Sequence, residues 1–158
     1  MGTISEVVLQ EMKATFKMIK KAVARIEGDF WKQDEKDWMY GYILFHIIET
    51  IEFYNSNSEE EWQPMNDVSQ DSRSKETATL ITKDKSFFEK HVADVETQTF
   101  DILQSFSEAD FLEEDGFAPR GFTSRLHKYN YVMRHCMFHL GELTKMLRNH
   151  DRERIGWE

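Results

Sequence analysis

The stretch YILFHII, residues 42–48, decides the fold class of this 158-residue chain. It is the centre of an apolar segment that runs from about residue 38 to residue 54. A helix that is apolar around its whole circumference is buried on most of its sides. The sequence therefore predicts a largely buried helix that carries one imidazole, that of His46, at its centre.

Three further segments repeat apolar residues at alternating steps of three and four, as amphipathic helices do. They run from about residue 3 to 28, from about 82 to 106 and from about 123 to 149. Thr3 and Glu6 have the spacing of a capping box at the start of the first segment. No stretch shows convincing strand alternation. The chain is therefore predicted to be all-α, a four-helix bundle in a single domain spanning residues 1–158.

A long polar connection, residues 55 to about 82, separates the second and third predicted helices and contains Pro64. A connection of this length is unusual in a compact domain and indicates that the segment has a role of its own. It can carry the chain back along the bundle, so that the two helices could run parallel, whereas short loops join antiparallel neighbours. One helical turn is expected near Lys75–Leu80, and the segment from 107 to 122 is expected to be irregular.

The composition limits the partners and surroundings of the protein. Its formal net charge is −9, so its average field repels phosphate backbones, and nucleic acid is not an expected partner. No apolar run approaches the roughly 20 residues that span a bilayer, and the N-terminus lacks the layout of a secretory signal. The single cysteine, Cys136, excludes an internal disulfide and fits a reducing compartment. We therefore expect a soluble cytoplasmic protein with no membrane partner.

Two of the six histidines, His135 and His139, are four residues apart in the last predicted helix. At 3.6 residues per turn, this spacing leaves them about 40° apart on one face, one turn above the other. Paired histidines of helical zinc sites have this geometry, although such a pair also arises often by chance. Both lie on a second stripe beside the main apolar stripe, so we expect them to face the bundle near its edge.

His46 adds a third imidazole in the most apolar helix. A lone buried histidine is more often a hydrogen-bonded core residue than a ligand. Leaving it unpaired would cost about 1–3 kcal/mol, whereas a metal ion shared with His135 and His139 would satisfy all three rings. Three protein ligands with one open position are typical of reactive metal sites, and closed sets of four are typical of structural ones.

The other candidate residues are weaker. We expect His91 to lie on the surface and His150 to belong to the charged tail, and His127 could line the mouth of a pocket. Cys136 falls on the main apolar stripe and points about 100° away from His135, so packing is favoured over ligation.

Several charged and aromatic residues have open roles. Glu49 and Glu142 each follow a candidate histidine by three residues, and each could be a ligand, an imidazole-orienting group or a solvated charge. A basic cluster near the start of the last helix could attract an anion, although ordinary surface charge is the more probable interpretation. The cluster consists of Arg120, Arg125, Lys128 and Arg134. Trp38 and Trp62 could line a pocket.

The stretch around His46, followed by HCMFHLGEL at residues 135–143, resembles the DinB-like (DinB/YfiT) superfamily of metal-binding proteins. The three ligand positions are matched and carry over as His46, His135 and His139. The family motif often has Arg before its glycine and Gln after it, where this chain has Leu140 and Glu142.

The resemblance implies a four-helix bundle of up-down-down-up topology, with a long crossover from helix two to helix three. It also implies zinc, nickel or a similar divalent ion, frequent homodimers, and thiol-dependent transferase or isomerase chemistry. We therefore expect a metal-dependent enzyme of the S-transferase type, with a small-molecule substrate and a low-molecular-weight thiol as possible co-substrate. A hydrolase is the second choice, and no catalytic residue is assigned. The alternatives are a non-catalytic helical binding or stress-response protein with a structural or vestigial metal, and histidines that are only core residues.

Overall fold

The computed structural model describes residues 3–32, 34–35, 38–66, 68 and 79–158. This part of the chain contains five α-helices, four of them long, so the all-α prediction is confirmed. The helices are α1 (Ile4–Ala24), α2 (Tyr40–Asn55), α3 (Lys85–Ser105), the short α4 (Glu108–Leu112) and α5 (Arg125–Asn149). Single 3-10 turns are η1 (Phe30–Lys32), η3 (Thr79–Thr82) and η4 (Ala118–Arg120). Two-residue strands β1 (Asp34–Glu35) and β2 (Trp38–Met39) pair antiparallel before α2.

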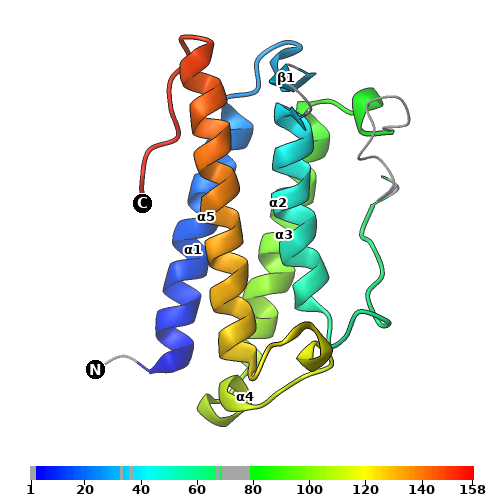
Figure 1. Ribbon diagram of the computed structural model, residues 1–158, viewed down its shortest axis with the longest axis vertical. Helices are drawn as coiled ribbons and strands as arrows, with labels where there is room; N and C mark the ends of the chain where they lie inside the picture. The colour runs from blue at the N-terminus through cyan, green and yellow to red at the C-terminus, as the bar shows by residue number, and fades with distance from the viewer. Residues whose placement is uncertain (1–2, 33, 36–37, 67, 69–78) are drawn as a thin grey trace.

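The four long helices lie side by side along the long axis of the molecule (Figure 1). Helix α2 packs against α3 and α5, and α1 packs against the same two helices. After α2, residues 56–66 run outside the helices and along α2, toward the end of the molecule where α3 begins (Figure 1). The described part of the long polar connection thus lies beside the helix that precedes it.

Local signals explain where the helices begin. The capping box of α1 is present: the Thr3 hydroxyl accepts from the Glu6 N–H at 3.3 Å, and the Glu6 carboxylate accepts from the Thr3 N–H at 2.8 Å. Asp84 and Ser124 cap α3 and α5, each within two residues of the predicted starts. Of the helical turn expected near 75–80, residues 75–78 lie outside the described residues, and η3 begins at Thr79.

The sequence predicted that the segment from 107 to 122 is irregular, and for part of the segment this prediction was wrong. It contains α4, which is capped by a reciprocal pair of bonds between Ser107 and Asp110. In turn, the Glu108 carboxylate accepts from the N–H groups of Ile4 and Ser5 at 3.1 and 3.2 Å, at the start of α1. A five-residue helix that caps another helix has too few residues to show a periodic apolar stripe.

Helix α2 is as buried as its composition predicts. Ile47, Ile48 and Ile51 are fully buried, and Gly41 permits close contact with the Trp31 ring, because a Cβ there would lie 2.7 Å from a ring carbon. Helices in the described part of the chain lack the combination of length and apolar character that crossing a bilayer requires.

Candidate metal centre

The structure brings His46, His135 and His139 together where α2 packs against α5. Each ring contributes one nitrogen atom, and these three nitrogens all lie within 4.8 Å of one another. Nε2 of His46 and Nε2 of His135 are 3.0 Å apart. The one-turn spacing along α5 places the ring centroids of His135 and His139 4.5 Å apart. A group of three imidazoles therefore forms from two packed helices.

The separation of one pair of nitrogens in this group fits a divalent ion. Two nitrogens that are each about 2.1 Å from one ion, at an angle of about 90–109°, are about 3.0–3.4 Å apart. The 3.0 Å separation of the two Nε2 atoms falls within this range. The three ring planes cross at 69°, 87° and 70°, so the rings meet at their edges rather than stack. Nitrogen lone pairs lie in the ring plane, and edge-on rings can direct them to a common point.

Glu142 orients the ring of His139. Its Oε2 is 2.6 Å from Nδ1 of His139, one turn earlier in α5. Because a carboxylate only accepts, this bond assigns the proton of the ring to Nδ1 and the lone pair to Nε2. Metal-ligating histidines commonly donate their second nitrogen to a carboxylate in this way. Of the three roles open for Glu142, the geometry selects the orienting one.

His135 is held in the form that ligates metals. Burial, together with the neighbouring His139, lowers the pKa of His135 to about 4. Its imidazole is therefore neutral near pH 7, and a neutral imidazole carries the lone pair that a metal needs. The Thr50 hydroxyl lies 3.3 Å from its Nε2. His46 is flanked on α2 by Tyr42, whose ring is parallel to the imidazole within 2°.

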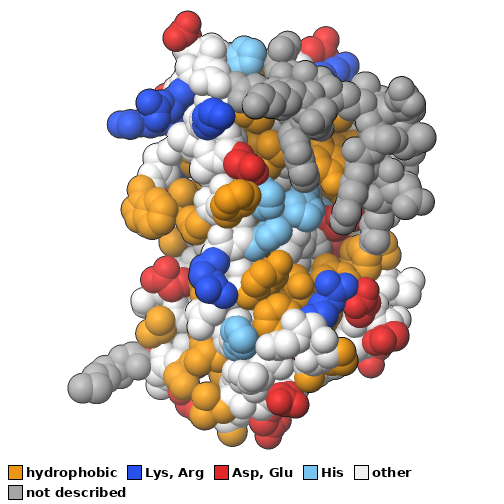
Figure 2. Space-filling model, in the orientation of Figure 1, with side chains coloured by type: hydrophobic (Ala, Val, Ile, Leu, Met, Phe, Trp, Pro, Cys, Tyr) orange, Lys and Arg blue, Asp and Glu red, His pale blue; other side chains and the backbone are white. Residues whose placement is uncertain are grey.

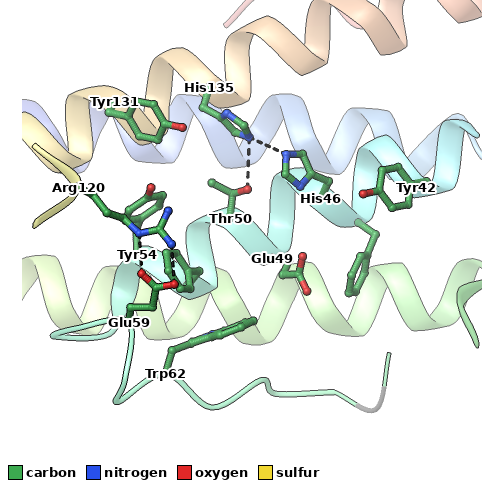
Figure 3. Close-up of a pocket in the computed structure, with 12 residues that line it drawn as sticks. Tyr42, His46, Glu49, Thr50, Tyr54, Glu59, Trp62, Arg120, Tyr131 and His135 are labelled. Atoms are coloured by element: carbon green, nitrogen blue, oxygen red, sulfur yellow. Dashed lines mark hydrogen bonds and ion pairs between the residues drawn. The ribbon is translucent and has the colours of Figure 1, made fainter. Parts of the chain in front are cut away.

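A cavity of about 330 Å³ opens beside this group (Figure 3). His46 and His135 line it, whereas His139 is buried and is not among the described residues that line it. The remaining lining residues are Tyr42, Phe45, Glu49, Thr50, Phe53, Tyr54, Glu59, Trp62, Arg120 and Tyr131. The surface of the molecule shows histidine side chains gathered over α2 and α5, next to hydrophobic ones (Figure 2). Two of the three imidazoles are thus reachable from the cavity.

The charged lining residues lie at different places in the cavity. Glu49 lies one turn from His46 on α2 and lines the cavity (Figure 3). Arg120 pairs with Glu59 at 2.7 Å and lies over the Phe53 ring, 5.0 Å from its centroid. The cavity therefore combines aromatic walls with one guanidinium and two carboxylates.

The expectation that His91 lies on the surface was wrong. Its side chain is buried on α3, and its Nε2 lies 2.8 Å from Oε2 of the buried Glu52 on α2. Sequence reasoning missed both residues. Helix α2 contains two carboxylates, Glu49 and Glu52, and only the structure shows that Glu52 is the buried one, which therefore needs a partner.

The other histidines and the cysteine lie outside the group. His127 is exposed beside Thr123 and is not among the described residues that line the cavity. His150 is exposed at the end of α5. Cys136 is buried in the core, as its stripe position predicted, and burial raises the pKa of its thiol to about 12.

Three residues of the basic cluster, Arg120, Arg125 and Lys128, each have an acidic partner. Arg125 is next to Glu113, 3.6 Å away, and Lys128 is buried in an ion pair with Asp115. Arg120 is the member of the cluster that lines the described cavity. Trp62 lines the cavity as proposed, and the side chain of Trp38 lies outside the described part of the structure.

No family model, no characterised protein and no solved structure matched this chain in the three comparisons made. The DinB-like resemblance is thus a prediction from two short sequence motifs.

Proposed function

We propose that the chain is a divalent-metal-binding protein that holds its ion through His46, His135 and His139 and acts on a small molecule. The observation that carries this proposal is the 3.0 Å separation of the two Nε2 atoms, beside a third imidazole and at the wall of a cavity. Among divalent ions, zinc and nickel suit an imidazole donor set.

The proposal includes membership of the DinB-like superfamily, with its up-down-down-up four-helix bundle. Two observations support this topology. Helices α2 and α3 pack against each other, and residues 56–66 of the connection between them run along α2. Parallel neighbours need such a crossover. The homodimer expected of the superfamily belongs to the same proposal.

The site suits catalysis better than a purely structural role, because three ligands leave a position for a substrate group. When bound, the ion would lower the pKa of a coordinated thiol or water, which then becomes a nucleophile near neutral pH. The residues of the chain contribute the rest. Glu142 fixes the ring of His139, His46 and His135 face the cavity, and the Glu49 carboxylate can accept a proton there. A cavity of about 330 Å³ is at the small end of ligand sites, which favours a small substrate.

We favour thiol transfer over hydrolysis on the basis of the resemblance. The cavity supports either reaction. A panel of small thiols with alkyl and epoxide electrophiles, run beside ester and amide substrates, separates the two: turnover that requires both thiol and metal supports the transferase.

Metal analysis of protein purified without an affinity tag or chelator tests the site itself. We expect about one equivalent of zinc or nickel per chain, or stoichiometric binding on addition to stripped protein. His139→Ala should abolish tight binding, and His127→Ala, at an exposed histidine outside the group, should leave it unchanged. If the wild-type protein binds neither ion, the imidazoles form a hydrogen-bonded core cluster and the proposal is wrong.

A further inference from the structure

A buried carboxylate–imidazole pair lies between α2 and α3, outside the three-histidine group. Glu52 is 1% exposed and His91 is 4% exposed, and Oε2 of Glu52 lies 2.8 Å from Nε2 of His91. Nδ1 of His91 is buried and has no hydrogen-bond partner among the described residues. This arrangement suits an imidazole protonated on Nε2, which donates to Glu52.

The pair also holds the connection that follows α2. The second oxygen of Glu52, Oε1, accepts from the backbone N–H of Met65 at 2.6 Å. Asn66 lies near the same edge of His91, with its Nδ2 3.3 Å from Nε2, but two N–H donors that face each other form no hydrogen bond. Its Oδ1 accepts from the Val68 N–H at 2.9 Å. We call residues 56–66 the strap, because its far end is attached here to α2 by the bond from Met65 to Glu52.

The strap forms one wall of the cavity beside the three histidines. Glu59 and Trp62 line the cavity, and the Trp62 ring meets the Phe53 ring edge to face at 5.2 Å (Figure 3). At its near end the strap is held by the Asn57 carbonyl, which accepts from the Gly116 N–H at 2.8 Å. Trp62 lies between these two attachments, so its position depends on both of them.

We propose that Glu52 and His91 are positioning residues for the cavity: His91 donates to Glu52, Glu52 fixes Met65, and this attachment holds Trp62 in place as part of the cavity wall. The role of this wall in ligand binding rests on the proposed function, but the attachment itself does not. Neither residue touches the three-histidine group in the described contacts, so the metal affinity of the site is independent of them.

Paired substitutions separate positioning from stability. Glu52→Leu removes both acceptors, which leaves His91 and the Met65 N–H without partners. The double variant Glu52→Leu/His91→Leu removes the unpaired imidazole too, and replacement of a whole buried pair by apolar residues is often neutral for stability. The double variant therefore recovers the fold while the Met65 bond remains lost. Thr99→Val is the matched control. It removes a fully buried hydroxyl that accepts from Asn55 between the same helices and has no described contact with the strap.

Two measurements on metal-free protein report on the strap. The first is the 19F resonance of 5-fluorotryptophan at position 62, identified by its loss in Trp62→Phe. The second is cleavage by a glutamate-specific protease at Glu59, Glu60 and Glu61, mapped by mass spectrometry. In the double variant we expect a solvent-like Trp62 resonance. We also expect cleavage that is roughly ten- to hundredfold faster, as follows from loss of a hydrogen bond to a charged acceptor. Thr99→Val should change neither.

The outcomes are distinct from those that test the metal. A folded double variant with an unchanged Trp62 resonance and unchanged strap cleavage overturns the positioning role, whether or not the protein binds zinc. Failure of the wild-type protein to bind zinc or nickel overturns the proposed function and leaves the strap result standing. Zinc affinity that falls in the double variant but not in Thr99→Val would contradict the independence of the two sites.

Discussion

Oε2 of Glu142 lies 2.6 Å from Nδ1 of His139, on the side of the ring that an ion bound to Nε2 would not occupy. We predict that Glu142→Gln weakens zinc binding by about 10–100-fold, the usual effect of removing a carboxylate behind a ligating histidine. Competition titration against a chromophoric chelator measures this change. Glu114→Gln, which removes an equal charge from an exposed residue outside the group and the cavity, should leave the affinity unchanged.

The depressed pKa of His135 makes metal-free protein sensitive to acid. Its folded pKa of about 4 lies below the ordinary value of 6.5, so between these pH values the unfolded chain binds more protons than the native one. The contribution of His135 to stability is therefore full above about pH 6.5 and is lost as the pH falls toward 4. Urea unfolding from pH 7.5 to 4 should show a decline that is shallower in His135→Gln. If the stability of both proteins falls equally as the pH is lowered, the imidazole of His135 is not held neutral in the native state.

The Lys128–Asp115 pair is expected to matter more for stability than the other ion pairs at that end of the molecule. Both side chains are nearly inaccessible, at 3% and 5% exposure, and burial lowers the pKa of Lys128. Removing one partner of a buried pair costs about 3–5 kcal/mol, so we predict a loss of this size for Asp115→Ala. Glu113→Ala breaks the more exposed pair with Arg125 and should cost less than about 1 kcal/mol. Chemical denaturation of both variants checks the difference.

Cys136 should be inert in the native protein. Its thiol is fully buried with a pKa of about 12, and the reactive species is the thiolate. We predict no reaction with a thiol-specific disulfide reagent at pH 8 on the time scale of minutes, and one equivalent of reaction after unfolding in guanidinium. Rapid labelling of folded protein would show that the core around α5 opens readily.

Bound metal should raise the stability of the whole chain. An ion that binds only the native state at 100 times its dissociation constant adds about 2.7 kcal/mol. Thermal unfolding with zinc should therefore shift upward in the wild-type protein and not in His139→Ala. A shift that persists in that variant would indicate binding elsewhere on the protein.

The helices and part of the site could be predicted because their signals are local. Apolar periodicity located α1, α3 and α5, and the four-residue spacing of His135 and His139 placed them on one face before any tertiary contact was known. His46 entered the prediction because an imidazole in an apolar helix needs a partner.

Other features depend on contacts that no local pattern contains. His91 follows Glu89 and Lys90, and so resembled a surface residue, whereas its partner Glu52 lies 39 positions earlier in the chain. The cavity wall that the strap forms depends in the same way on the contact between Met65 and Glu52. Such placements follow from packing of the helices, which local periodicity does not specify.

The ligand set divides between two helices that are far apart in the chain. His46 and His135 are 89 positions apart, with α3 between them. An ion held by both would close a loop of that length, as a covalent cross-link does, but reversibly. Its chain-entropy effect would be on the order of 4–5 kcal/mol in the loop-closure model. A fragment that ends before α5 would lack two of the three imidazoles, so full metal affinity would report that the two halves of the chain have come together.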